Sequence, residues 1–245
     1  MKIELVVALV SAAVALVTLG FTFWGQIRTT RLADKLESLR LAEQRRFDAE
    51  QTSARYREPL ARAAYDLQSR LYNVLQQDFL GAYYDAGDPR ERSYAVDNTT
   101  FLIAQYFAWT EIVRRDLQYI DLGQSEPTRR LARLQDDIYS LFSTDRFPRI
   151  LRVFAGEQRA IGDRMIKKGK QCLECCGYAA YLDNVVLSGD RLIDALSDDV
   201  KILSTNLDTA RPRLIVLQQA LVDLLVFLDP DFVRFPKERR TKVPA

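Results

Sequence analysis

Residues 212–228, PRLIVLQQALVDLLVFL, contain the clearest helical pattern in the chain. The leucines recur at intervals of three and four residues, so they share one face of an α-helix, which turns once every ~3.6 residues. That apolar face is wide, which is typical of a helix packed inside a bundle. The leucines that define it are Leu214, Leu217, Leu221, Leu224, Leu225 and Leu228.

The same spacing recurs upstream and predicts further helices. No run of alternating polar and apolar residues is long enough to suggest a sheet. We therefore predict an all-α domain, a bundle of about six helices over residues 59–228, followed by a loose, basic, proline-containing tail at 229–245. The expected helices begin and end near 59–84, 93–122, 128–143, 156–166, 172–187, 190–203 and 212–228.

The N-terminal part of the chain has a different character. Residues 5–27 contain no charged residue, and the stretch from Leu5 to Trp24 is almost entirely apolar. Twenty helical residues span about 30 Å, the thickness of the hydrocarbon core of a bilayer. The run ends in bulky residues and not in the small-x-small site of a cleaved signal peptide. The sequence therefore predicts a transmembrane anchor at residues 1–27.

The charges on either side of this run predict its orientation. Lys2 and Glu4 precede it, whereas four basic and two acidic residues lie between residues 28 and 40. Basic residues are enriched on the cytoplasmic side of membrane spans, so we expect a single-pass protein of the cell membrane with its N-terminus outside. Three closely spaced cysteines, an odd number, also suit a reducing compartment.

Residues 28–58 are rich in alanine, leucine, glutamate and arginine and lack glycine and proline, which predicts a polar helical stalk. Pro59 is expected to begin the next helix. Leu32, Leu36 and Leu39 follow the four-three spacing of a coiled-coil seam, but charged residues then replace the apolar ones. The sequence is therefore compatible with two interpretations of the stalk, a short coiled coil and a solvated single helix.

The composition excludes several functions. The net charge of +2 argues against dedicated nucleic-acid binding, which usually requires a strongly basic face. The chain contains no histidine, so it cannot form a Ser-His-Asp triad, a Cys-His dyad or a histidine-ligated metal site. No cofactor is predicted.

A cysteine cluster is the most suggestive candidate site. Cys172, Cys175 and Cys176 would share one face if residues 172–187 were helical. Three thiolates favour a soft metal, but a closed zinc site needs a fourth ligand, which would have to be a carboxylate or come from a second subunit. Redox chemistry is a second option, because the lysines of residues 167–170 lie nearby and would lower the pKa of a thiol. Packing in the core is the third, because free cysteine is among the residues most often buried.

Two further groups of polar residues are candidates. The first is a glycine at an expected helix start with charged neighbours, whose backbone N–H groups suit an anion unless it is an ordinary helix start. The second is a carboxylate and a guanidinium four residues apart on the long helix, forming either a polar site in the core or an interhelical salt bridge. The residues are Gly156, Glu157, Arg159 and Arg164 for the first group, and Glu111 and Arg115 for the second.

These patterns favour a membrane-tethered helical interaction or sensory module without catalytic activity. The expected partners are the lipid bilayer through residues 5–27 and either another protein or a second copy of the chain. One alternative is a histidine-free enzyme that uses carboxylates or the cysteine cluster with a metal. The other is a structural subunit of a membrane complex, since a helical bundle alone does not distinguish these functions.

Overall fold

The computed structural model describes residues 2–120, 126–169 and 172–244, with side chains throughout 55–115, 126–169 and 172–244 and at part of the positions before 55. The chain divides into two compact units, Met1–Thr52 and Ser53–Ala245. The described backbone of the first unit is helical and belongs to helix α1 (Lys2–Gln76). The second unit contains the end of α1 and every later element.

The second unit is mostly helical, so the predicted all-α class is confirmed. Its β structure in the described residues is one short antiparallel hairpin of β1 (Ile166–Lys168) and β2 (Leu173–Cys175). The other elements after α1 are η1 (Gly81–Asp85), α2 (Pro89–Ile120), α3 (Glu126–Ser143), α4 (Ala155–Met165), α5 (Tyr178–Tyr181), η2 (Leu182–Val186), α6 (Arg191–Thr205), α7 (Leu207–Leu228) and η3 (Lys237–Arg239).

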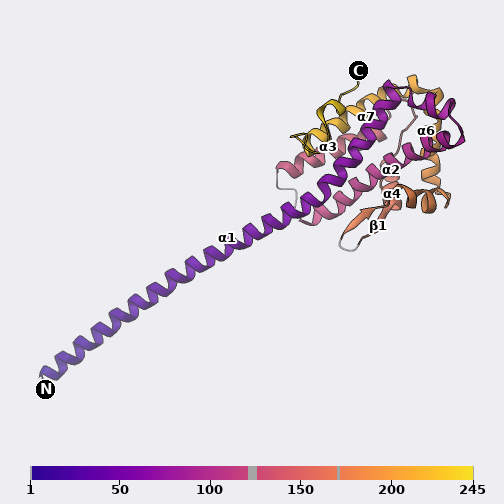
Figure 1. Cartoon of the computed structure of the whole chain (residues 1–245). Helices are drawn as coiled ribbons and strands as arrows, with labels where there is room; N and C mark the ends of the chain where they lie inside the picture. The colour runs from indigo at the N-terminus through magenta and orange to yellow at the C-terminus, as the bar shows by residue number, and fades with distance from the viewer. Residues whose placement is uncertain (1, 121–125, 170–171, 245) are drawn as a thin grey trace. The chain divides into compact units, whose positions relative to one another are not determined.

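Within this unit, α2 packs against α4, α6 and β2, and α7 packs against α3 (Figure 1). The Arg57 Nε donates to the carbonyl oxygen of Leu228 at 2.5 Å, and the Arg211 Nη1 donates to that of Leu75 at 3.3 Å. The end of α1 therefore lies beside the start of α7, and the two helices run antiparallel. The leucines predicted for the buried face of α7 are all buried in the core between these elements.

Helices α2 and α4 approach closely because a glycine lies at their crossing. A Cβ atom built on Gly162 would lie 2.8 Å from the Phe107 carbonyl oxygen, a backbone atom that cannot rotate away. Gly162 thus allows the two helix backbones to contact each other directly.

Replacing Gly162 with alanine should therefore push α4 away from α2 and lower the unfolding free energy by about 1–3 kcal/mol, the usual cost of overpacking. Gly156→Ala is the matched control on the same helix, since nothing lies within 4 Å of its added Cβ. The control should be neutral or slightly stabilising, because alanine favours helix more than glycine does. Urea unfolding followed by circular dichroism compares them, and equal stabilities would argue against the close crossing.

The start of the bundle differs from the prediction at Pro59. Pro59 lies inside α1 and does not begin a new helix. Proline has no backbone N–H, so a proline within a helix cannot donate the usual hydrogen bond to the carbonyl oxygen four residues earlier. Tyr56, one turn earlier, is already buried in the core, and Leu60 is buried just after the proline. Packing on both sides of Pro59 compensates for the lost bond and keeps the chain helical.

The connection between α1 and α2 also differs from the prediction, because it begins and ends earlier in the chain and is longer. The helix expected to reach residue 84 ends at Gln76, and Asp78 adopts a left-handed backbone conformation with φ of 48°. Helix α2 then begins at Pro89, within the predicted loop. The Asp88 carboxylate accepts the Glu91 N–H and the Glu91 carboxylate accepts the Asp88 N–H, both near 2.9 Å. This reciprocal capping fixes the helix start.

The prediction of a helix over residues 172–187 is wrong for its first part. β1 and β2 pair so that Lys167 lies opposite Glu174 and Ile166 lies opposite Cys175. Ile166 and Cys175 pack against the core, whereas Lys167 is exposed. Each strand has only three residues, too few for a strand period to be recognised in the sequence. Helical turns follow only from Tyr178.

The tail after α7 packs onto the bundle, so the prediction of a loose tail is wrong. Phe235 is 2% exposed and stacks on Tyr65 of α1, with ring centroids 4.6 Å apart. The Gln218 amide donates to the Thr241 carbonyl and accepts the Val243 N–H. The buried Phe235 and Val243 and these hydrogen bonds hold the tail on the bundle. The three prolines only prevent the tail from forming a long helix.

The predicted membrane span at residues 5–27 lies mostly outside the residues whose side chains are described. Among the described residues, no helix has a stretch both long and apolar enough to cross a bilayer.

Candidate functional site

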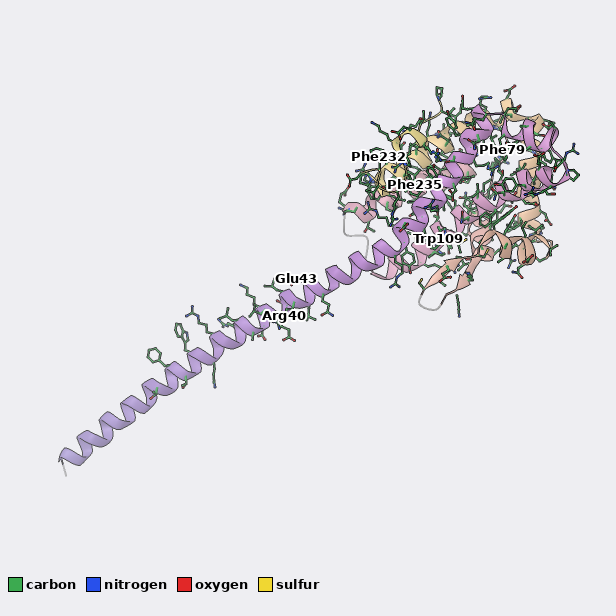
Figure 2. The ribbon with its side chains drawn as sticks, in the orientation of Figure 1. Arg40, Glu43, Phe79, Trp109, Phe232 and Phe235 are labelled. Atoms are coloured by element: carbon green, nitrogen blue, oxygen red, sulfur yellow. The ribbon has the colours of Figure 1, made fainter. Side chains whose placement is uncertain are left out.

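An open pocket of about 630 Å³ lies where the end of α1 meets η1 and the start of α2. Its walls combine aromatic rings with cationic and amide side chains. The lining residues are Arg70, Asn73, Gln77, Phe79, Ala82, Tyr83, Arg90, Glu91 and Tyr94. Figure 2 shows Phe79 well apart from Phe232 and Phe235, so this pocket is distinct from the region where the tail packs.

Arg70 is the unusual residue of this pocket. Its side chain is only 7% exposed, and its guanidinium carbon lies 3.9 Å from the centroid of the Phe79 ring and 5.6 Å from that of Tyr94. The Nη2 donates to the Asn98 Oδ1 at 2.7 Å. The Nη1 is shielded from solvent and has no hydrogen-bond partner. Arg70 is therefore a buried cation with an unused Nη1, which carries two N–H donors.

No carboxylate neutralises Arg70 in the described part of the chain. Burial lowers the pKa of Arg70, and the opposing influences come from the hydroxyls of Tyr94 and Tyr178. Neutral phenols compensate a buried positive charge much less than a carboxylate does. Glu91, the carboxylate in the pocket lining, is bonded to the backbone of Asp88 at the start of α2. The pocket therefore has a positive character, which the exposed Arg90 reinforces.

The structure brings Glu111 and Arg115 together, as the sequence suggested. Glu111 is 4% exposed and accepts two hydrogen bonds from Arg114, at 2.6 and 2.7 Å, and one from Arg115 at 2.7 Å. Arg115 also pairs with Asp163 of α4. Burial alone would raise the pKa of Glu111, but the bonds from both arginines hold it below its ordinary value of 4.5. The cluster links α2 to α4, with every carboxylate oxygen of Glu111 occupied.

The three cysteines are free thiols at the hairpin and not on one helical face. The Cys175 thiol donates to the Cys176 carbonyl oxygen at 3.4 Å, and the Cys176 sulfur lies 3.8 Å from that of Met165. Among the described residues, no group of cysteines and carboxylates is arranged to hold a metal ion. Contact with Cys175, aided by Lys167, lowers the pKa of Cys176 to about 7, so this half-buried thiol is the most reactive feature of the cluster.

The candidate anion site at the start of α4 is not assembled as expected. The Glu157 carboxylate folds back and accepts the Phe154 N–H at 2.9 Å, placing a negative charge at the positive end of the helix. Arg164 lies at the opposite end of α4, where it pairs with Asp190 at 2.7 Å. Arg159 stacks over Tyr139. These residues therefore do not converge on one ligand.

Arg70 was not predicted as a site residue, although its position in the sequence marks it as unusual. It lies three residues after Leu67 and next to Leu71, on the face of α1 that the leucine spacing predicts to be buried. A charged residue is rarely buried unless it is paired, so its presence on such a face marks it as special. What the sequence does not show is that the loop at 77–88 folds back to form the rest of the pocket.

No protein-family model, curated protein or solved structure matches the chain. Function therefore has to follow from its own residues.

Proposed function

We propose that the chain is a membrane-tethered helical module that binds other molecules and does not catalyse a reaction. Residues 5–27 form the anchor, residues 28–58 form the stalk, and the bundle lies at the cytoplasmic face of the membrane. The observation that carries this proposal is the uncharged run from Leu5 to Ile27, followed at once by basic residues.

Side chains near the end of that run support the anchor. Phe21 is 71% exposed and Trp24 is 65% exposed, so this chain does not cover them. The Arg28 guanidinium lies 5.9 Å from the centroid of the Trp24 ring. Aromatic rings followed by an arginine suit the interface between lipid and water, where tryptophan is enriched and arginine reaches the headgroups.

The stalk supports an interaction role. Leu32, Leu36 and Leu39, which share the four-three spacing, are 54%, 60% and 60% exposed. Exposed leucines in this register suit a seam with a second helix, and a second copy of the chain offers the same seam. Two chains anchored side by side in one membrane would also meet at a high effective concentration. Self-association through the stalk is therefore part of the proposal.

Extraction of membranes with alkaline carbonate tests the anchor. The full chain should stay in the membrane pellet. Val10→Lys combined with Val14→Lys should release it, because each lysine at the centre of a span costs about 2.5–3.5 kcal/mol. Leu32→Lys combined with Leu36→Lys is the matched control, with the same spacing and charge outside the run, and should stay in the pellet. Release of the unaltered chain would contradict membrane tethering.

A further inference from the structure

The pocket at the end of α1 contains a charge that the protein does not balance. Burying a cation without a counter-charge costs several kcal/mol, and a ligand that supplies the counter-charge would recover part of that cost. Arg70 keeps stacking contacts with Phe79 and Tyr94 and one hydrogen bond to Asn98, but its Nη1 is unused. An anion bound in the pocket would supply the missing negative charge.

The other walls describe the rest of the ligand. Tyr83 and Tyr94 are 45% and 47% exposed, so aromatic surface is available for stacking. The Phe79 ring centroid lies 5.1 Å from that of Tyr83. The side-chain amides of Asn73 and Gln77 make no hydrogen bond within the described structure and can donate or accept. The volume of about 630 Å³ falls within the range of small-molecule sites.

We propose that this pocket binds a small organic anion in which a carboxylate or phosphate group is attached to a planar ring. Arg90, exposed in the pocket lining, makes the first contact with the anionic group, and the charge of Arg70 attracts it further inward. The ring stacks on Tyr83 or Tyr94. Because solvent does not reach the Nη1 of Arg70, a direct bond to it requires the part of the pocket wall that covers this nitrogen to move aside.

This chemistry excludes other ligands. A metal ion or an organic cation would be repelled by the two arginines, and Glu91 is already bonded to the backbone of Asp88. A neutral ring would gain the stacking but would leave Arg70 unpaired. An inorganic anion would gain the charge interaction but would leave the aromatic walls without a partner. The inference does not depend on whether residues 5–27 span a membrane.

Calorimetric titration of the full chain in mild detergent tests the proposal with four probes: benzoate, phenyl phosphate, benzamide and inorganic phosphate. Benzoate or phenyl phosphate should bind about tenfold more tightly than both benzamide and inorganic phosphate, because a charged hydrogen bond contributes about 1.4 kcal/mol or more. The tighter of the two aromatic anions identifies the anionic group. Equal affinity for benzamide and benzoate would overturn the proposal, as would no binding at about 10 mM.

Variants then locate the site. Arg90→Gln removes an exposed charge without a structural contact and should weaken binding of the aromatic anion about fivefold to tenfold. Arg149→Gln changes an exposed arginine that does not line the pocket and should leave the affinity unchanged. Unchanged affinity in Arg90→Gln would place the anion elsewhere and overturn the proposal.

Arg70→Met gives an independent readout, because methionine keeps much of the volume without the charge. In the unaltered chain, saturating aromatic anion should raise the melting temperature. The same concentration should not raise it in Arg70→Met, with circular dichroism confirming that the variant is folded. If the variant does not fold, the milder Tyr94→Leu should weaken the binding of the aromatic anion more than that of inorganic phosphate. An equal thermal shift in a folded Arg70→Met would contradict the role of Arg70.

Discussion

Replacing Arg213 with alanine should lower the unfolding free energy by about 3–5 kcal/mol, among the largest effects of any single substitution in the bundle. Arg213 is fully buried on α7. Its Nη1 donates to the carbonyl oxygens of Leu141 and Phe142 at 2.5 and 3.0 Å. Its Nη2 donates to those of Thr144 and Pro148 at 2.9 and 3.1 Å.

The physical reason is the end of α3. The last four carbonyl groups of a helix have no partner within the helix, and the negative end of the helix dipole lies there. The planar guanidinium of Arg213 donates to two of these carbonyl groups and to two more in the turn that follows α3. Alanine removes the donor from the Leu141, Thr144 and Pro148 carbonyls and opens a cavity, whereas the Phe142 carbonyl keeps the N–H of Val153. Lysine carries its N–H donors on a single nitrogen and cannot reach all four carbonyl groups, so Arg213→Lys should recover only part of the lost stability.

Urea unfolding of the full chain, followed by circular dichroism, measures this effect. Arg211→Ala is the matched control two residues away, because Arg211 is partly exposed and makes one long hydrogen bond to Leu75 and a loose pair with Asp208. The control should cost about 1 kcal/mol or less. Similar losses in both variants would show that Arg213 does not hold the end of α3 in place.

Replacing Asp229 with asparagine should destabilise the bundle by about 3 kcal/mol at neutral pH, because it leaves a buried guanidinium without its counter-charge. Asp229 accepts the backbone N–H groups of Val233, Arg234 and Phe235 at 3.0–3.2 Å and pairs with Arg240. The Arg240 side chain is 2% exposed and also donates to the carbonyl oxygen of Asp229 at 2.8 Å. This cluster fixes the tail against the end of α7.

The effect should depend on pH. Burial alone would raise the pKa of Asp229, but the N–H groups of Phe235 and Arg234, then Arg240, hold it below its ordinary value of 3.8. The folded state therefore favours the carboxylate. Its contribution is complete above the unfolded pKa and is lost as the pH falls through the folded pKa. The stability gap between the unaltered chain and Asp229→Asn should therefore narrow below about pH 4.

Asp223→Asn is the control for this prediction. Asp223 pairs with Lys242 of the same tail at 2.7 Å, but both side chains are about half exposed, so the loss should be under about 1 kcal/mol at any pH. Unfolding free energies measured between pH 3 and 8 compare the two variants. If the difference in unfolding free energy between the unaltered chain and Asp229→Asn is the same at every pH, the carboxylate charge does not stabilise the tail.

The periodic apolar spacing was sufficient to predict the main helices. The helices expected at 156–166, 190–203 and 212–228 correspond to α4, α6 and α7, with no end shifted by more than five residues. Leucine spacing works here because each helix buries one stripe against the others. The predicted division into anchor, stalk and bundle is not tested by the fold of the second unit.

The errors arose where short segments owe their structure to distant contacts. Cys172–Cys176 is amphipathic as a strand or as a helix, and only its packing beside α2 decides between them. The tail looked loose because proline and basic residues favour extended, solvated chain. Its partners, Gln218 on α7 and Gln68 on α1, are polar residues inside otherwise apolar helix faces.

The apolar spacing therefore does not predict the contacts that buried polar residues make. Arg70, Arg213 and Gln218 all lie on faces that the leucines mark as buried. The sequence shows that each is an exception but not what it contacts, because the contacts come from loops and tails with no regular pattern. The same limit explains why the pocket at Arg70 was not predicted while the Glu111–Arg115 pair, which is local to one helix, was.

The central claim is that residues 5–27 hold the bundle at the cytoplasmic face of a membrane. Protease protection in sealed vesicles that keep the cellular orientation tests it most directly, using the full chain with an epitope tag after Ala245. The account predicts that the tag stays with the membranes, survives added trypsin, and is lost only when the vesicles are opened. Digestion of the tag in sealed vesicles, or its presence in the soluble fraction, would contradict the account.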